Sequence, residues 1–130
     1  MATSGQNRRS AKALYPKRGE IYLASFDPSL GLEIKKTRPA LVIQNDIGNR
    51  VTEMTIVAPI TSTVRFPLNP VHVIIPATGA TGLTVVSVAL MNQIRAMDRV
   101  RLVKRLGMID AQTQEQVDEA IKISLGLIAL

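Results

Sequence analysis

Short apolar runs separated by turn residues fill the middle of the chain. Runs of this length that are rich in β-branched side chains are typical of strands. The expected strands are residues 21–26, 39–44, 55–58, 71–75 and 85–94, with a further short strand within 101–109. Segments rich in Pro, Gly, Asn and Asp lie between them, and we expect turns at 27–31, 45–49 and 77–82. A chain of 130 residues with this pattern predicts one mainly β domain.

The C-terminal segment has a different apolar spacing, which predicts one amphipathic helix. The apolar side chains that recur three and four residues apart are Val117, Ala120, Ile121, Leu125 and Ile128. Asp110 is a plausible N-cap and Gly126 a stop signal for this helix. Many short strands and one terminal helix favour a small curled β-barrel with the helix packed on it.

Positive charge is spread unevenly along the chain, whose formal net charge is +6. Residues 1–18 carry five basic side chains and no acidic one, and residues 35–109 carry ten basic and three acidic ones. A basic centre suits a polyanion such as nucleic acid, although ordinary surface charge for solubility is an equal alternative. We expect residues 1–17 to be a flexible basic arm, or a short transit peptide, and residues 18–130 to be the folded domain.

Several functional classes are disfavoured by what the sequence lacks. There is no cysteine, so disulfide scaffolds and thiol catalysis are excluded, and the chain suits a reducing compartment or is indifferent to redox conditions. The expected location is the cytoplasm. No apolar stretch approaches the length of a membrane span, and we expect no membrane association. The one histidine, His72, lies in an apolar strand, where a packed residue is the more common role. We therefore expect neither a metal site nor a cofactor.

Arg38 and Thr61 lie near the ends of expected strands. Arg38 precedes Pro39, which favours an extended backbone, and a guanidinium there can donate two hydrogen bonds to one phosphate. Thr61 can donate a further hydrogen bond to the same group. From composition alone the alternative is stronger, namely that Arg38 forms a surface ion pair with Glu33 or Asp27 and that Thr61 belongs to a turn.

The order of these motifs resembles the MazF/PemK family of toxins. The resemblance covers residues 18–126 through five segments in the family's order, each weak alone. They are Arg18-Gly19-Glu20-Ile21-Tyr22-Leu23 with Phe26-Asp27-Pro28, then Gly31-Leu32-Glu33 with Lys36-Thr37-Arg38-Pro39, then Thr55 to Ser62, then Gly82-Leu83 with Ser87, and finally Gln93 to Asp98 with Arg101-Leu102 and Leu106-Gly107.

The resemblance implies a fold and an activity. The family fold is an SH3-like, CcdB/PemK-type β-barrel with a C-terminal helix, in agreement with the pattern of strands. Members are homodimeric toxins of type II toxin–antitoxin systems that cut single-stranded RNA. The family's catalytic residues correspond to Arg38 and Thr61, with Glu33 from the preceding loop. The residues expected to contact RNA are Lys35, Lys36, Ser62, Ser87, Asn92, Gln93 and Arg95. An acidic, partly disordered antitoxin is the expected protein partner.

The chain departs from the family pattern at two positions. Tyr22 replaces a common Trp, and Asn92 replaces an acid found in some members, which affects base preference. Two rival functions share the fold: a CcdB-like gyrase poison, which has no catalytic Arg/Thr pair, and a noncatalytic RNA-binding barrel.

The expected reaction uses a nucleophile that RNA itself carries. The ribose 2′-OH attacks the adjacent phosphorus and expels the 5′-oxygen, so DNA, which lacks that hydroxyl, should not be cut. Arg38 would stabilise charge on the nonbridging oxygens, Thr61 would orient the phosphate, and Glu33 would accept the 2′-OH proton.

Overall fold

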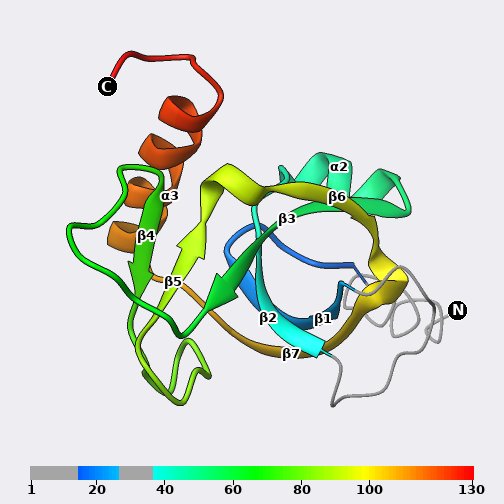
Figure 1. The fold of residues 1–130 in the computed structure, drawn as a ribbon. Helices are drawn as coiled ribbons and strands as arrows, with labels where there is room; N and C mark the ends of the chain where they lie inside the picture. The colour runs from blue at the N-terminus through cyan, green and yellow to red at the C-terminus, as the bar shows by residue number, and fades with distance from the viewer. Residues whose placement is uncertain (1–14, 27–36) are drawn as a thin grey trace, which may run out of the picture.

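A curled antiparallel sheet and a C-terminal helix form the fold in the computed structural model, which describes residues 15–26 and 37–130 (Figure 1). The described strands are β1 (Glu20–Ser25), β2 (Thr37–Val42), β3 (Met54–Thr61), β4 (His72–Ile75), β5 (Ser87–Leu90), β6 (Arg95–Asp98) and β7 (Leu102–Met108). The described helices are α2 (Asp46–Val51) and α3 (Ala111–Ser124), with the 3₁₀ turns η2 (Met91–Gln93) and η3 (Arg99–Arg101).

The strands form a path in the order β4-β5-β3-β2-β1-β7, and β6 pairs with β3 beside it. This confirms the expected mainly β class with a C-terminal helix. Within the described ranges β4 and β7 are the ends of the path, so the sheet curls without closing into a continuous ladder. The strand β3 occupies the centre, because it pairs with β2, β5 and β6.

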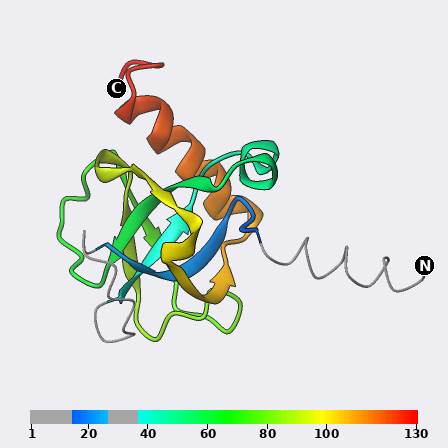
Figure 2. The same ribbon diagram turned by 90° about the vertical axis from the view of Figure 1, so that its right-hand side faces the viewer.

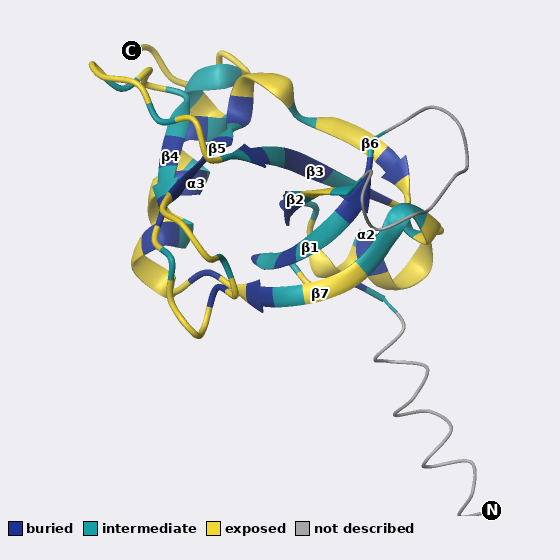
Figure 3. Cartoon of the chain, turned by 60° about the horizontal axis from the view of Figure 1, so that its bottom comes forward, coloured by how far each residue is buried: buried dark blue, intermediate teal, exposed yellow. Residues whose placement is uncertain are grey.

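The sheet buries apolar side chains on both of its faces. One cluster includes Leu41, Ile60, Ile75 and Met91 and packs against Val117 of α3. The helix lies along β4 and η2, on one side of the curled strands (Figure 2). A second, smaller cluster consists of Ala24, Ala40, Val42, Val57 and Met97. Buried residues therefore concentrate on the central strands, whereas β6 and β7 present exposed side chains (Figure 3).

The helix α3 begins and ends where its sequence signals predict. The Asp110 carboxylate accepts a hydrogen bond of 2.8 Å from the backbone N–H of Thr113, which confirms the N-cap. Gly126 has a φ of +75°, which confirms the glycine stop. Val117 and Ala120 are buried as expected. Leu125, however, is exposed, because it follows the last helical residue instead of lying on the packed face.

Two expected elements differ in the structure. Residues 45–49 were expected to be a turn, but the helix α2 begins there, because the Asn45 side chain accepts a hydrogen bond of 2.8 Å from Gly48 N and caps it. The strand expected over 85–94 is shorter in the structure, because β5 ends at Leu90 and η2 follows it, and a separate strand, β6, begins only at Arg95. Gln93 therefore lies in a 3₁₀ turn and not in a strand.

Candidate active site

Arg38 and Thr61 meet where β2 and β3 separate. The ladder between these strands runs from Val42 opposite Val57 to Ala40 opposite Pro59. Continuing the same register by two residues on each strand places Arg38 opposite Thr61. Because side chains alternate between faces, both lie on the face that carries Ala40. Arg38 lies inside β2, instead of ahead of the strand as expected.

A pocket of about 350 Å³ opens between these strand ends and the segment before β5. Its lining residues are Thr37, Arg38, Pro39, Ile60, Thr61, Ser62, Leu83, Thr84, Val85 and Ser87. Four of the predicted site residues are thus brought together: Arg38, Thr61, Ser62 and Ser87. The guanidinium and several hydroxyl groups give this pocket the donors that a phosphate requires.

The hydroxyl of Thr61 is oriented by its own chain. Its oxygen accepts a hydrogen bond of 3.2 Å from the backbone N–H of Thr63. Since the lone pairs face that N–H, the hydroxyl proton remains able to donate to a bound oxygen. Arg38 is exposed, and Thr61 is half-buried. A substrate therefore reaches both groups without displacing core residues.

Ser87 has a different position from Ser62. Its hydroxyl donates a hydrogen bond of 3.0 Å to the carbonyl of Val85, and its side chain is buried. Ser87 therefore shapes the pocket wall, while Ser62, the residue after β3, is exposed at the rim.

Asn92, Gln93 and Arg95, which were predicted to contact RNA, lie outside this pocket. All three are exposed on η2 and β6. Arg95 lies opposite Val57, four residues before Thr61 along β3, which corresponds to about 13 Å of strand. The Arg95 guanidinium stands 5.6 Å from the centre of the Phe26 ring, a cation–π arrangement. A single-stranded polymer could span both positions.

Three further predicted residues, Glu33, Lys35 and Lys36, lie outside the described residues. Reasoning from sequence missed the apolar part of the lining, in particular Ile60 and Val85. The sequence indicates these two residues only through their closeness to predicted site residues, since Ile60 precedes Thr61 and Val85 lies two residues before Ser87.

Tyr22 occupies the position at which the family pattern commonly has Trp. Burial raises the pKa of Tyr22 to about 12, helped by the negative charge of Glu20 and a hydrogen bond to it. Tyr22 is therefore a neutral donor near pH 7. It packs against the second cluster, so its role is structural.

Comparison with known proteins identifies the family. Residues 17–125 match the PemK-like, MazF-like toxins of type II toxin–antitoxin systems. The chain belongs to this family. It is 45% identical over 112 residues to Endoribonuclease EndoA of Bacillus subtilis, an alignment that covers 86% of this chain and 96% of the relative.

Solved structures have the same fold. MazF from Deinococcus radiodurans superposes with a TM-score of 0.68 at 31% identity, covering 86% of this chain and 97% of that one. A mycobacterial endoribonuclease in complex with its cognate antitoxin superposes with a TM-score of 0.71, covering 88% of this chain and 99% of that one. At 22% identity, this second likeness shows the fold alone.

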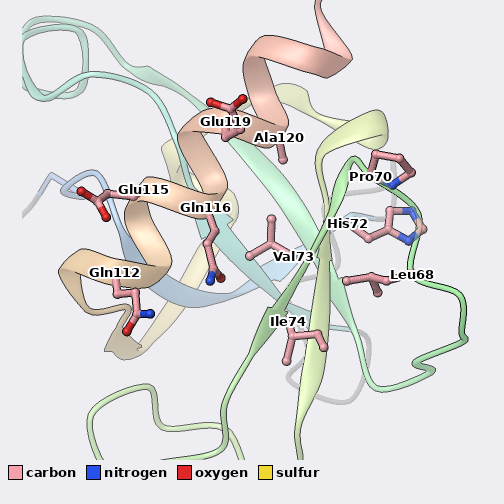
Figure 4. A pocket seen from close by; sticks show the side chains of 10 residues that line it. All are labelled: Leu68, Pro70, His72, Val73, Ile74, Gln112, Glu115, Gln116, Glu119 and Ala120. Carbon is pink, nitrogen blue, oxygen red and sulfur yellow. The ribbon is translucent and has the colours of Figure 1, made fainter. Parts of the chain in front are cut away.

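A second groove in this MazF-like toxin has the opposite electrostatic character. It has a volume of about 630 Å³ and lies between β4 and α3 (Figure 4). Glu115 and Glu119 project from the helix, and His72 lines the strand side. Carboxylates repel phosphates, so the groove does not suit RNA. His72 lines this groove and does not line the pocket of Arg38.

Neither a metal cluster nor a membrane span is found in the described ranges. Across residues 15–26 and 37–130, no three His, Asp or Glu side chains are grouped so that they could hold a metal ion. In the same ranges no helix combines the length and apolar character that crossing a bilayer requires.

Proposed function

We propose that this chain is an endoribonuclease toxin that cleaves single-stranded RNA at Arg38 and Thr61. The observation that carries the proposal is their convergence in one open pocket, with Ser62 at its rim. The name of a relative at 45% identity supports the activity: EndoA of Bacillus subtilis is an endoribonuclease. The family matched is not that of gyrase poisons, so the CcdB-like alternative has no support.

The chemistry follows from the donors in the pocket. A scissile phosphate bound there would place its nonbridging oxygens at the guanidinium of Arg38 and the hydroxyl of Thr61. The 2′-OH loses its proton and attacks phosphorus, the bond to the 5′-oxygen breaks, and that oxygen takes up a proton. A 2′,3′-cyclic phosphate and a 5′-hydroxyl result. Charge that develops on the nonbridging oxygens is stabilised mainly by Arg38.

The general base remains a proposal from the family resemblance. Glu33 would accept the proton of the 2′-OH, and Lys35 and Lys36 would bind flanking phosphates. Asn92, Gln93 and Arg95 would contact RNA further along the groove, because their side chains are exposed on the adjoining β6 and η2. Single strands are favoured, since their bases can turn outward to meet such side chains.

Partners and location follow from the same family. We propose a homodimer and an acidic antitoxin, as antitoxin complexes are among the solved structures of similar toxins. Exposed Leu125, Leu127 and Leu130 at the C-terminal end provide apolar surface that a second subunit would cover. The cytoplasm is the proposed compartment, since the target is messenger RNA.

The deciding experiment compares wild type with Arg38→Ala on a long unstructured RNA in EDTA, beside an all-DNA copy. We expect discrete RNA fragments from wild type, intact DNA, and a rate loss of about 10²–10³ for Arg38→Ala. The matched control is Arg65→Ala, because Arg65 is also exposed but does not line the pocket. Binding of RNA without cleavage by wild type would favour the noncatalytic barrel.

A further inference from the structure

One wall of the pocket belongs to neither of the strands that carry the proposed catalytic residues. Leu83, Thr84 and Val85 come from the connection between β4 and β5 and line the same pocket as Arg38. Val85 is 53% exposed, although it is an apolar side chain beside a charged site. The pocket therefore has a cationic, hydroxyl-bearing side and a largely aliphatic side.

Two glycines hold this wall against β7. The backbone at Gly82 has a φ of +72°, and a Cβ there would lie 2.0 Å from the carbonyl oxygen of Leu106. A Cβ on Gly107 would lie 2.1 Å from the carbonyl oxygen of Ala80. Both contacts are with backbone, which cannot swing aside as a side chain can. The two segments can approach this closely only because both positions are glycine.

Hydrogen bonds fix the same connection internally. Met108 N donates to Ala80 O at 2.9 Å, which ties it to β7. The buried hydroxyl of Thr81 donates to Pro76 O at 2.7 Å and accepts from Thr78 N at 3.1 Å. A wall with these constraints presents a fixed shape to whatever occupies the pocket.

The occupant follows from size and chemistry. A volume of about 350 Å³ is near the lower limit for ligand pockets and suits one nucleotide unit rather than several. The phosphate belongs on the side of Arg38 and Thr61. The aliphatic surfaces of Leu83 and Val85 suit the flat face of a base, and the hydroxyl of Thr84 can donate to or accept from its edge.

We propose that Leu83, Thr84 and Val85 form a base subsite for the nucleotide beside the scissile phosphate, and that this wall helps to set the cleavage sequence. The inference rests on the proposed function. A rigid wall discriminates by shape, because a base of another size either clashes with it or leaves a gap.

The neighbouring valine provides a matched control. Val86 is 52% exposed and adjacent in sequence, yet it does not line the pocket. The experiment measures cleavage rates of wild type, Val85→Ala and Val86→Ala on short RNAs in which the base on each side of the cut is varied in turn. Thr84→Val, which keeps the shape and removes the hydroxyl, forms a third variant. Thermal melting of each variant confirms folding.

We expect Val85→Ala to change the ratio of rates between preferred and disfavoured bases by roughly tenfold at one position beside the cut, and Val86→Ala to leave it within about twofold. Thr84→Val should alter preference at the same position. Identical base preferences for all four proteins, with wild type cleaving normally, would overturn the base subsite and leave the proposed function intact. Absence of cleavage by wild type on every RNA would instead overturn the proposed function and the subsite with it.

Discussion

Arg38 and Thr61 each stand two residues beyond Ala40 and Pro59, the last pair of the β2–β3 ladder. The shared register puts both side chains on one face of the sheet, at the point where the strands part and the pocket opens. The site is thus positioned by the pairing of β2 with β3.

Replacing Thr61 by Val should slow cleavage by about 10–100-fold, because a hydrogen bond to a charged phosphate is lost while the shape is kept. Single-turnover cleavage of one RNA substrate measures the rate. Thr63→Val is the control, since Thr63 contributes only its backbone N–H to the Thr61 hydroxyl. An equal loss in both variants would argue against a role for the Thr61 hydroxyl.

Gly107→Ala should lower the free energy of unfolding by about 3 kcal/mol, because the new methyl group would overlap the carbonyl of Ala80. Urea unfolding at equilibrium measures it. Gly79→Ala is the comparison, as nothing lies within 4 Å of a Cβ at Gly79. If Gly107→Ala were as stable as Gly79→Ala, the close contact with β7 would be wrong.

Asn49→Ala should destabilise the fold by about 2 kcal/mol, because Asn49 is fully buried and its side-chain amide is hydrogen-bonded to both Thr55 and Gln44. It accepts hydrogen bonds from Thr55 Oγ1 at 2.7 Å and from Gln44 Nε2 at 2.9 Å, and it donates to Gln44 O at 3.0 Å. Chemical denaturation measures the loss, with exposed Asn92→Ala as the reference variant. A loss no larger than that of Asn92→Ala would contradict the network.

Acid should weaken the cap of α3. The backbone N–H of Thr113 donates to Asp110 and holds the pKa of that carboxyl below its ordinary value of 3.8. A lowered folded pKa stabilises the protein above pH 3.8, and this contribution is lost as pH falls through the folded pKa. Asp110→Asn keeps an acceptor that does not titrate in this range.

Thermal melting at pH 7 and at pH 3 tests this linkage. We expect wild type to lose more stability than Asp110→Asn between the two values. The same loss in both proteins would show that Asp110 does not contribute to the acid sensitivity.

Much of the fold could be predicted from sequence, because its signals are local. Short apolar runs between turn residues located β1, β3 and β4, and Asp110 with Gly126 bounded α3. The helix α2 was missed, since Asn45 followed by Gly48 is equally typical of a turn, and only tertiary contacts of Asn49 decide between them.

The break between β5 and β6 could not be predicted, because it depends on strand register. Ile60 of β3 pairs with Ala89 of β5, and Val57 of β3 pairs with Arg95 of β6. The two paired positions on β3 are three residues apart, whereas their partners, Ala89 and Arg95, are six residues apart. The extra residues form η2.

The site was predictable only in part. Arg38 and Thr61 were predicted through the family resemblance, but Leu83 and Val85 are ordinary apolar residues. They join the pocket because β5 pairs with the end of β3, a contact between segments far apart in the sequence.

The pairing of β1 with β7 has a consequence for synthesis of the protein. Ile21 faces Gly107, and the Arg18 side chain binds Asp118 at 2.6 Å, so the earliest part of the folded chain is completed by the last. Until a ribosome has made residue 108, β1 lacks one of its neighbours and presents an open hydrogen-bonding edge. A message cut between the codons of Thr61 and Leu102 would yield a chain that contains Arg38 and Thr61 but lacks β7 and α3, so β1 would keep its open edge.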